Sequence, residues 1–122
     1  MSNPTILLVE DNYDNMTLMK MLIEHSSKNV VTALDGKQGL FIAKTQPPDL
    51  IILDLDMPVM NGWDMMKELK RDPALKNIPV LVVTAHLLPN ERKKVIDAGG
   101  SGYVSKPFRI TEFLSEIENC LA

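Results

Sequence analysis

Short apolar runs alternate with longer amphipathic stretches from one end of the chain to the other. The runs are mostly aliphatic and show no polar alternation, which is typical of strands covered on both faces of a parallel sheet. Five such strands are predicted, at residues 6–9, 30–33, 50–53, 80–83 and 102–104. Thr84 closes the fourth of them.

An amphipathic stretch follows each predicted strand. In the first stretch, two pairs of apolar residues repeat at the four-residue spacing of a helix face, Leu18 with Leu22 and Met19 with Ile23. Asn12 or Asp14 can cap the start of this helix. Four further helices are predicted at residues 36–44, around 63–69, from 89 to the glycine pair at 99–100, and around 113–121 to the end of the chain.

Five consecutive β-α units with right-handed crossovers favour an α/β fold, a flavodoxin-like doubly wound sheet of five parallel strands with five helices. The economical strand order is 2-1-3-4-5, which makes the first and third strands neighbours. The 122 residues contain no linker, repeat or low-complexity segment. We therefore expect one domain over residues 1–122, without an appended effector domain.

Composition narrows the functional classes. The hydrophobic fraction of 45% can supply a core without disulfides, and Cys120 is a single cysteine, which fits a reducing compartment. A net charge of -3 and the absence of a Lys/Arg-rich cluster argue against nucleic acid as a partner. No apolar run approaches membrane-spanning length. We expect a soluble cytoplasmic protein that binds neither nucleic acid nor membrane.

Carboxylates follow two of the predicted strands directly. Glu10 and Asp11 end the first strand, and Asp54 ends the third. Neighbouring parallel strands deliver such residues to one edge of the sheet, where open α/β folds bind ligands. Singly, each acid could equally be a helix cap or a solvated turn residue, but together they predict a site for a hard divalent cation, and Mg²⁺ suits it best.

Two further polar residues end strands on the same edge. Thr84 follows the fourth strand and Lys106 the fifth. Alone, the threonine would be an ordinary strand residue and the lysine a surface charge. Beside a metal-bound carboxylate, however, an ammonium can neutralise phosphoryl oxygens and a hydroxyl can donate a hydrogen bond to one. Pro107 either takes the cis form of a tight turn or starts the last helix.

The order and spacing of these residues resemble the receiver domain of two-component response regulators over essentially the whole chain. The matching motifs are Glu10-Asp11, Asp54, Met57-Pro58, Asn61-Gly62, Thr84 and Lys106-Pro107. The resemblance implies that Asp54 is the phosphoacceptor. It also implies that Asp11, Asp54 and the backbone carbonyl of Asp56 bind Mg²⁺, with Glu10 contributing through water.

The resemblance further implies how the signal is received and read. Lys106 would contact the phosphoryl group, and Thr84 and Tyr103 would form the switch. The phosphodonor would be a histidine kinase or a histidine phosphotransfer protein, and the output an unknown protein target. The protein would be a monomer or a weak phosphorylation-dependent dimer. The surface that reads the switch would cover the fourth helix, fifth strand and fifth helix, and include His86, Leu87, Leu88, Tyr103 and Phe108.

Two further expectations concern Asp56 and the methionines. Asp56 adds an anion near the phosphoryl group, and we hypothesise that it alters the lifetime of the phosphorylated state, in either direction. Five methionines in helical segments are predicted to fill the core rather than a binding surface: Met16, Met19, Met21, Met65 and Met66.

Two other functions compete with a phosphorylation switch. Asp54-Leu55-Asp56 also matches the DxD motif of haloacid-dehalogenase-like phosphatases, in which the first Asp is the nucleophile and the second the general acid. Those enzymes usually have Thr or Val where this chain has Pro58, and carry extra segments over the substrate. A flavodoxin-like cofactor binder needs a phosphate-cradling loop after the first strand, where Glu10 and Asp11 would repel phosphate. The switch is favoured, the phosphatase is the alternative, and the cofactor binder ranks last.

Overall fold

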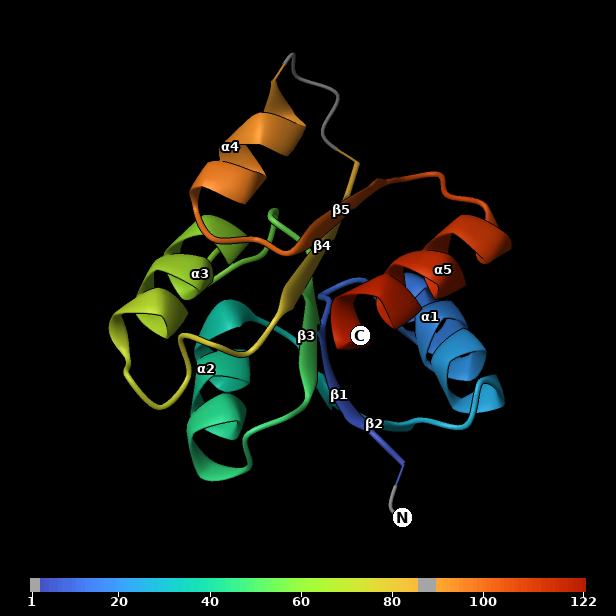
Figure 1. Ribbon diagram of the computed structural model, residues 1–122, viewed down its shortest axis with the longest axis horizontal. Helices are drawn as coiled ribbons and strands as arrows, with labels where there is room; N and C mark the ends of the chain where they lie inside the picture. Colours follow the sequence, from blue (N-terminus) through green and yellow to red (C-terminus); the bar gives the residue numbers. More distant parts are fainter. Residues whose placement is uncertain (1–2, 86–89) are drawn as a thin grey trace.

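The computed structural model describes residues 3–85 and 90–122, and strands and helices alternate along it (Figure 1). The strands are β1 (Thr5–Val9), β2 (Asn29–Ala33), β3 (Leu50–Leu53), β4 (Val80–Thr84) and β5 (Gly102–Ser105). The helices are α1 (Tyr13–His25), α2 (Gly36–Thr45), α3 (Gly62–Arg71), α4 (Glu91–Asp97) and α5 (Ile110–Leu121). The predicted elements are all present, with strand ends within one residue of expectation.

The strands form one parallel sheet in the order β2-β1-β3-β4-β5, as predicted. In register, Val9 lies beside Ala33 of β2 on one side and beside Leu53 of β3 on the other. This places the ends of β1 and β3 next to each other. The polar residues that follow these strands must therefore share one edge of the sheet.

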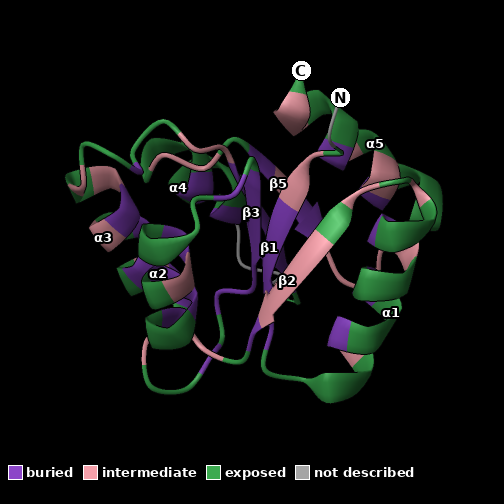
Figure 2. Cartoon of the chain, turned by 90° about the horizontal axis from the view of Figure 1, so that it is seen from below, coloured by how far each residue is buried: buried purple, intermediate pink, exposed green. Residues whose placement is uncertain are grey.

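Helices cover both faces of the sheet, with α1 and α5 on one side and α2, α3 and α4 on the other (Figure 1). The strands contribute alternate residues to two apolar clusters, for example Leu7, Ile51 and Val82 to one and Leu8, Ile52 and Val83 to the other. Figure 2 shows β1 and β3 buried between the helices, while the edge strand β2 is mostly half-buried. Burial on both faces explains why the central strands are continuous apolar runs.

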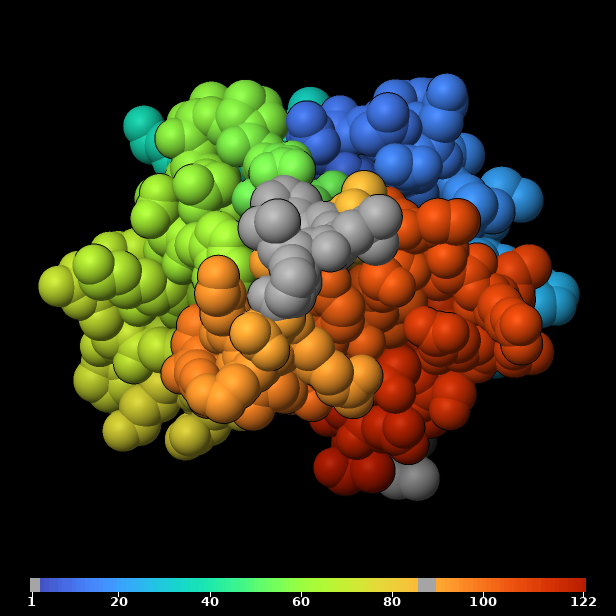
Figure 3. All heavy atoms as spheres, turned by 90° about the horizontal axis from the view of Figure 1, so that it is seen from above, coloured from blue at the N-terminus to red at the C-terminus, as the bar shows by residue number. Residues whose placement is uncertain are grey.

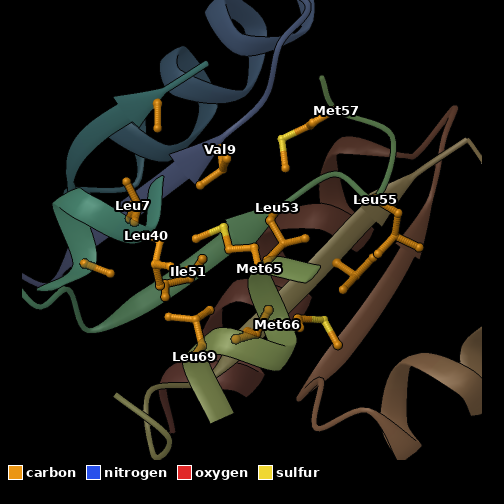
Figure 4. Packing of buried hydrophobic residues seen from close by; sticks show 14 of the residues in the cluster. Leu7, Val9, Leu40, Ile51, Leu53, Leu55, Met57, Met65, Met66 and Leu69 are labelled. Atoms are coloured by element: carbon orange, nitrogen blue, oxygen red, sulfur yellow. The ribbon is translucent and has the colours of Figure 1, made fainter. Parts of the chain in front are cut away.

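Close packing around the end of β3 holds the loop that follows it. Figure 4 shows Met65 and Met66 of α3 against Leu53, with Met57 and Leu55 packing nearby. All five side chains are at most 8% exposed. The unbranched methionine side chains fill irregular space between helix and sheet. The β3–α3 loop is thus anchored on its inner side.

One prediction about a residue in a helix is wrong. Met21 was expected in the core, but its side chain is 62% exposed, because the buried stripe of α1 runs through Met16, Met19 and Ile23 instead. Helix α4 begins at Glu91 and ends at Asp97. The predicted start at Pro89 lies outside the described residues. Within residues 3–85 and 90–122, no helix is long and apolar enough to cross a membrane.

Candidate functional site

Glu10 and Asp54 are brought together by the backbone pairing at the carboxyl ends of β1 and β3. The Asp54 N–H donates to the Val9 carbonyl at 3.2 Å, and the Glu10 N–H donates to the Ala33 carbonyl at 3.0 Å. The pairing therefore continues one residue beyond each strand. It fixes the backbone of both acids, and their position depends on the sheet rather than on a free loop.

Three carboxylates form a compact cluster at this edge. One oxygen each from Glu10, Asp11 and Asp54 lies within 4.8 Å of the others. Glu10 is 1% exposed and Asp54 8% exposed, whereas Asp11 is open to solvent. Carboxylate oxygens with an open, hydrated side are the donor set that Mg²⁺ prefers, because this ion keeps several of its waters. The residues present thus fit a magnesium ion.

Lys106 joins the cluster from the end of β5. Its ammonium donates to Glu10 Oε1 at 2.6 Å and to Asp54 Oδ2 at 2.9 Å. Burial raises the pKa of the Glu10 carboxyl, and the hydrogen bond from Lys106 offsets this only in part. For Lys106, burial alone would lower the pKa, but the hydrogen bonds and negative charges of Glu10 and Asp54 outweigh it and raise the pKa. The lysine therefore stays charged and balances part of the acidic charge.

Thr84 ends β4 next to Lys106, whose backbone N–H donates to the Thr84 carbonyl at 2.8 Å. The threonine is fully buried, and its hydroxyl has no hydrogen-bond partner among the described residues. Buried hydroxyls without a partner are exceptional in native proteins. This one can donate to an oxygen that arrives at the sheet edge.

Tyr103 lies on β5 opposite Val82 of β4 and packs against the cluster on the α2, α3 and α4 side. Its ring is half-buried. Burial raises the pKa of the Tyr103 phenol, and the negative charge of Glu91 on α4 adds to this. The phenol therefore stays protonated at neutral pH.

The β3–α3 loop closes tightly over the site. The Asp56 N–H donates to Asp54 Oδ1 at 3.1 Å, and the Gly62 N–H donates to the Leu55 carbonyl at 3.0 Å. A Cβ on Gly62 would lie 2.5 Å from the Asp54 carbonyl oxygen, so only glycine allows this closure. The Asp56 side chain itself is exposed and is not a member of the three-carboxylate cluster.

Val59 occupies an unusual position in the same loop. Its φ is 68°, and the Met60 N–H donates to the Pro58 carbonyl at 2.7 Å, which defines a classic γ-turn. This turn is strained, especially for a β-branched residue. The side chain is 77% exposed and gains little from packing in return.

An apolar cavity of about 380 Å³ opens beside Lys106, between α1 and the segment after β5. It is lined by Asn15, Leu18, Met19, Ala85, Lys106, Pro107 and Phe108. Figure 3 views the carboxyl edge of the sheet, with the blue start of α1 beside the green residues after β3 and beside the orange residues after β5. Sequence reasoning missed this cavity, because its lining residues come from separate segments and share no motif.

Only part of the surface predicted to read the switch lies within the described residues. His86, Leu87 and Leu88 lie outside them. Phe108 stacks on Phe113 at a centroid distance of 4.8 Å and packs with the α1 and α5 cluster. It also lines the cavity beside α1. The peptide bond between Lys106 and Pro107 is cis, one of the two forms that the sequence allowed.

Comparison with known proteins gives consistent matches. Residues 6–118 match the family described as response regulator receiver domain. The polar-differentiation response regulator DivK of Brucella anthropi is 34% identical over 117 residues, which cover 96% of this chain and 95% of the relative.

Solved structures agree with these sequence matches. The chemotaxis response regulator CheY4 of Vibrio cholerae superimposes with a TM-score of 0.91 at 27% identity, covering 98% of this chain and all of that one. The receiver domain of the sensor histidine kinase PA1611 from Pseudomonas aeruginosa superimposes with a TM-score of 0.90 at 28% identity and 98% coverage of both chains. That structure has a magnesium ion coordinated in its active-site cleft.

Proposed function

Because the chain belongs to the response regulator receiver family, we propose that it is a phosphorylation-controlled switch in which Asp54 accepts a phosphoryl group from a histidine kinase or a histidine phosphotransfer protein. One observation carries this proposal. The Asp54 carboxylate stands at a strand end within an acidic cluster and is held by the Lys106 ammonium at 2.9 Å. This arrangement orients a nucleophile and supplies a cation beside it.

The acidic cluster supports Mg²⁺ as the cofactor. Asp11 and Asp54 would bind the ion with the backbone carbonyl of Asp56, and the buried Glu10 would contribute through water. When bound, the ion would neutralise phosphoryl oxygens and the developing charge on them. The receiver domain of PA1611, with magnesium in its cleft, supports this assignment by similarity.

The chemistry assigned to the chain's own residues is a single group transfer. A carboxylate oxygen of Asp54 attacks phosphorus in line, the P–N bond to the donor histidine breaks, and a P–O bond forms. The electron pair of the broken bond returns to the imidazole nitrogen. Lys106 faces the equatorial phosphoryl oxygens and stabilises the charge spread over them. Fixed backbone at the ends of β1 and β3 supplies the orientation.

The switch uses a contact that the unmodified protein lacks. The buried Thr84 hydroxyl, without a partner among the described residues, would donate to a phosphoryl oxygen on Asp54. Such a differential contact shifts an existing conformational equilibrium. Tyr103 lies on the adjacent strand β5. It would then move inward behind Thr84. The surface formed by α4, β5 and α5 would report the change to a protein target.

The organisation of the molecule follows from the same assignment. We propose that residues 1–122 form one receiver domain, in keeping with the 95% of the DivK relative that the match covers. Association would be at most a weak dimer that depends on phosphorylation.

The direct test is the intact mass of the protein after incubation with Mg²⁺ and acetyl phosphate. We expect one phosphoryl adduct on the unaltered protein and none on Asp54→Asn or in the presence of a chelator. Asp14→Asn, which alters an exposed acid in the first turn of α1, is the matched control and should keep the adduct.

Two outcomes would count against the proposal. An adduct that persists in Asp54→Asn would place the acceptor elsewhere. Continuous release of inorganic phosphate from many donor molecules, without a stable adduct, would favour the phosphatase alternative built on Asp54 and Asp56.

A further inference from the structure

Helix α2 presents a stripe of exposed apolar and basic side chains. Phe41 is 66% exposed, and Leu34, just before the helix, is 52% exposed. Lys37 and Lys44 are also exposed, and they flank the phenylalanine ring at the spacing of one helix face. We call these four residues the α2 stripe. A single exposed apolar residue is ordinary on a protein surface, but a row of this kind is typical of an interaction site.

Close packing on the inner side of α2 holds the stripe outward. A Cβ on Gly39 would lie 2.9 Å from Val9 Cγ2, and one on Gly36 would lie 2.3 Å from the Met60 carbonyl oxygen. The Gly36 N–H also donates to that carbonyl at 3.0 Å. A rotation of α2 that buried Phe41 would drive larger side chains into these contacts. The stripe is therefore preorganised, and a partner does not have to reorder the helix in order to bind it.

The positive charge of the α2 stripe is not balanced by neighbouring acids. Residues 36–45 contain no Asp or Glu. Asp35 is engaged as the N-cap of α2, where its carboxylate accepts from the Gln38 N–H at 2.8 Å. Neither Lys37 nor Lys44 makes an ion pair with any residue in the described ranges 3–85 and 90–122. A protein with a net charge of -3 thus carries a local positive surface around an aromatic ring.

The α2 stripe lies away from the surface proposed to read the switch. Helix α2 contacts β1 and β2, whereas α4 and α5 contact β5 at the opposite edge of the sheet. Figure 1 shows α3 between α2 and α4. No residue of the stripe belongs to the three-carboxylate cluster. We therefore expect a partner on the stripe to bind equally well whether or not Asp54 is phosphorylated.

We propose that the α2 stripe is a docking site for an acidic helical segment of a partner protein. Lys37 and Lys44 are separated by about 10.5 Å along the helix axis, at a rise of 1.5 Å per residue. Two carboxylates seven residues apart on a partner helix have the same separation, and an aliphatic side chain between them would cover the Phe41 ring. The desolvated ring supplies affinity, and the opposite charges supply orientation and selectivity. Docking would tether this protein to its partner while leaving the α4, β5 and α5 surface open.

The test is a nuclear magnetic resonance titration of the isotope-labelled full chain with a synthetic helix-forming peptide of about 15 residues. The peptide carries two glutamates seven residues apart with leucine between them. We expect the amide shifts to concentrate in residues 36–45. Phe41→Ala should weaken binding about fivefold, and Lys37→Glu combined with Lys44→Glu about tenfold or more.

Two variants on α1 are matched controls for the α2 stripe. Lys20→Glu reverses an exposed lysine, and Met21→Ala shortens a side chain that is 62% exposed. Both residues belong to a helix on the other face of the sheet (Figure 1). Each control should bind the peptide as the unaltered protein does. Circular dichroism and the urea midpoint show whether every variant is folded.

Each contrary outcome identifies a different error. Absence of amide shifts in α2 at millimolar peptide would overturn the proposal, and so would equal binding of a peptide with lysine in place of both glutamates. If the α2 variants instead lose binding to phosphatidylglycerol vesicles and the acidic peptide does not bind, the stripe faces a membrane and the proposal is wrong. The titration uses unphosphorylated protein, so a failure of Asp54 to accept phosphate would refute the proposed function without affecting this test.

Discussion

Replacing Lys106 by Met removes the ammonium that binds two buried carboxylates while keeping most of the length of the side chain. The Lys106 side chain is 15% exposed, and those of Glu10 and Asp54 are 1% and 11% exposed. Removing one partner of a buried ion pair typically costs about 3–5 kcal/mol, because the remaining charge is left uncompensated. Since Asp11 and the lysine are partly hydrated, we expect the lower end of this range, about 3 kcal/mol of unfolding free energy.

The loss of unfolding free energy in Lys106→Met should depend on whether Mg²⁺ is present, which makes the prediction specific to this site. In a chelator at pH 7, urea unfolding followed by circular dichroism should show the full destabilisation of Lys106→Met. Mg²⁺ at a hundred times its dissociation constant stabilises a folded protein by about 2.7 kcal/mol. The variant should recover at least this much, and bind Mg²⁺ more tightly than the unaltered protein, because a positive charge has been removed from the site. Trp63, which packs against the α2, α3 and α4 cluster close to the β3–α3 loop, is a fluorescent reporter for the titration.

Two controls separate this effect from the general loss of a lysine. Lys93 pairs with Asp97 on the surface of α4, where both side chains are more than half exposed. Lys93→Met should cost less than about 1 kcal/mol, with no dependence on Mg²⁺. Adding Glu10→Gln to Lys106→Met should restore stability in the chelator. The reasoning would be refuted if Lys106→Met were as stable in chelator as the unaltered protein. The folded state would then not depend on the ammonium to compensate the charge of the carboxylates.

Three further predictions follow from the same site. Val59→Gly should raise the unfolding free energy by about 1 kcal/mol, because glycine adopts the φ of 68° without strain, and a lower urea midpoint would contradict this. Burial raises the pKa of Glu10 in the folded protein, so the stability that this group contributes is present below about pH 4.5 and is lost as the pH rises through the raised pKa. In chelator, Glu10→Gln should therefore be more stable than the unaltered protein at pH 7, and its free energy of unfolding should decline less above pH 4.5. Asp56→Asn should change the first-order rate at which the phosphorylated protein loses phosphate, measured by mass spectrometry after donor removal, and equal rates would dismiss a role for this side chain.

Local patterns along the chain were enough to predict the architecture. Continuous apolar runs such as 50–53 have one stable environment, the middle of a sheet covered on both faces, and the intervening amphipathic stretches supply that cover. Strand order followed from the handedness of the crossovers, and it was enough to predict that Glu10 and Asp54 meet. Helix boundaries were less certain, since α4 begins at Glu91, where the chain has no side-chain cap to mark the position.

The face that a residue takes on a helix was harder to predict than the helix itself. Met21 and Leu18 are apolar but exposed, because the position of α1 against the sheet buries the stripe through Met16 and Met19 instead. Helical spacing gives the relative angles of residues around the axis but not the side that packs. That choice depends on α5, which contacts α1 from the other end of the chain.

The sequence by itself determined the fold class, the sheet edge that carries the chemistry and the residues that gather there, because strand ends and their polar successors are local features. Only the tertiary structure decided that Lys106 bridges Glu10 and Asp54, that the Thr84 hydroxyl is buried without a described partner, and that an apolar cavity adjoins them. These features depend on distances between segments up to 96 residues apart. Such distances are set by packing across the whole domain, which no local pattern encodes.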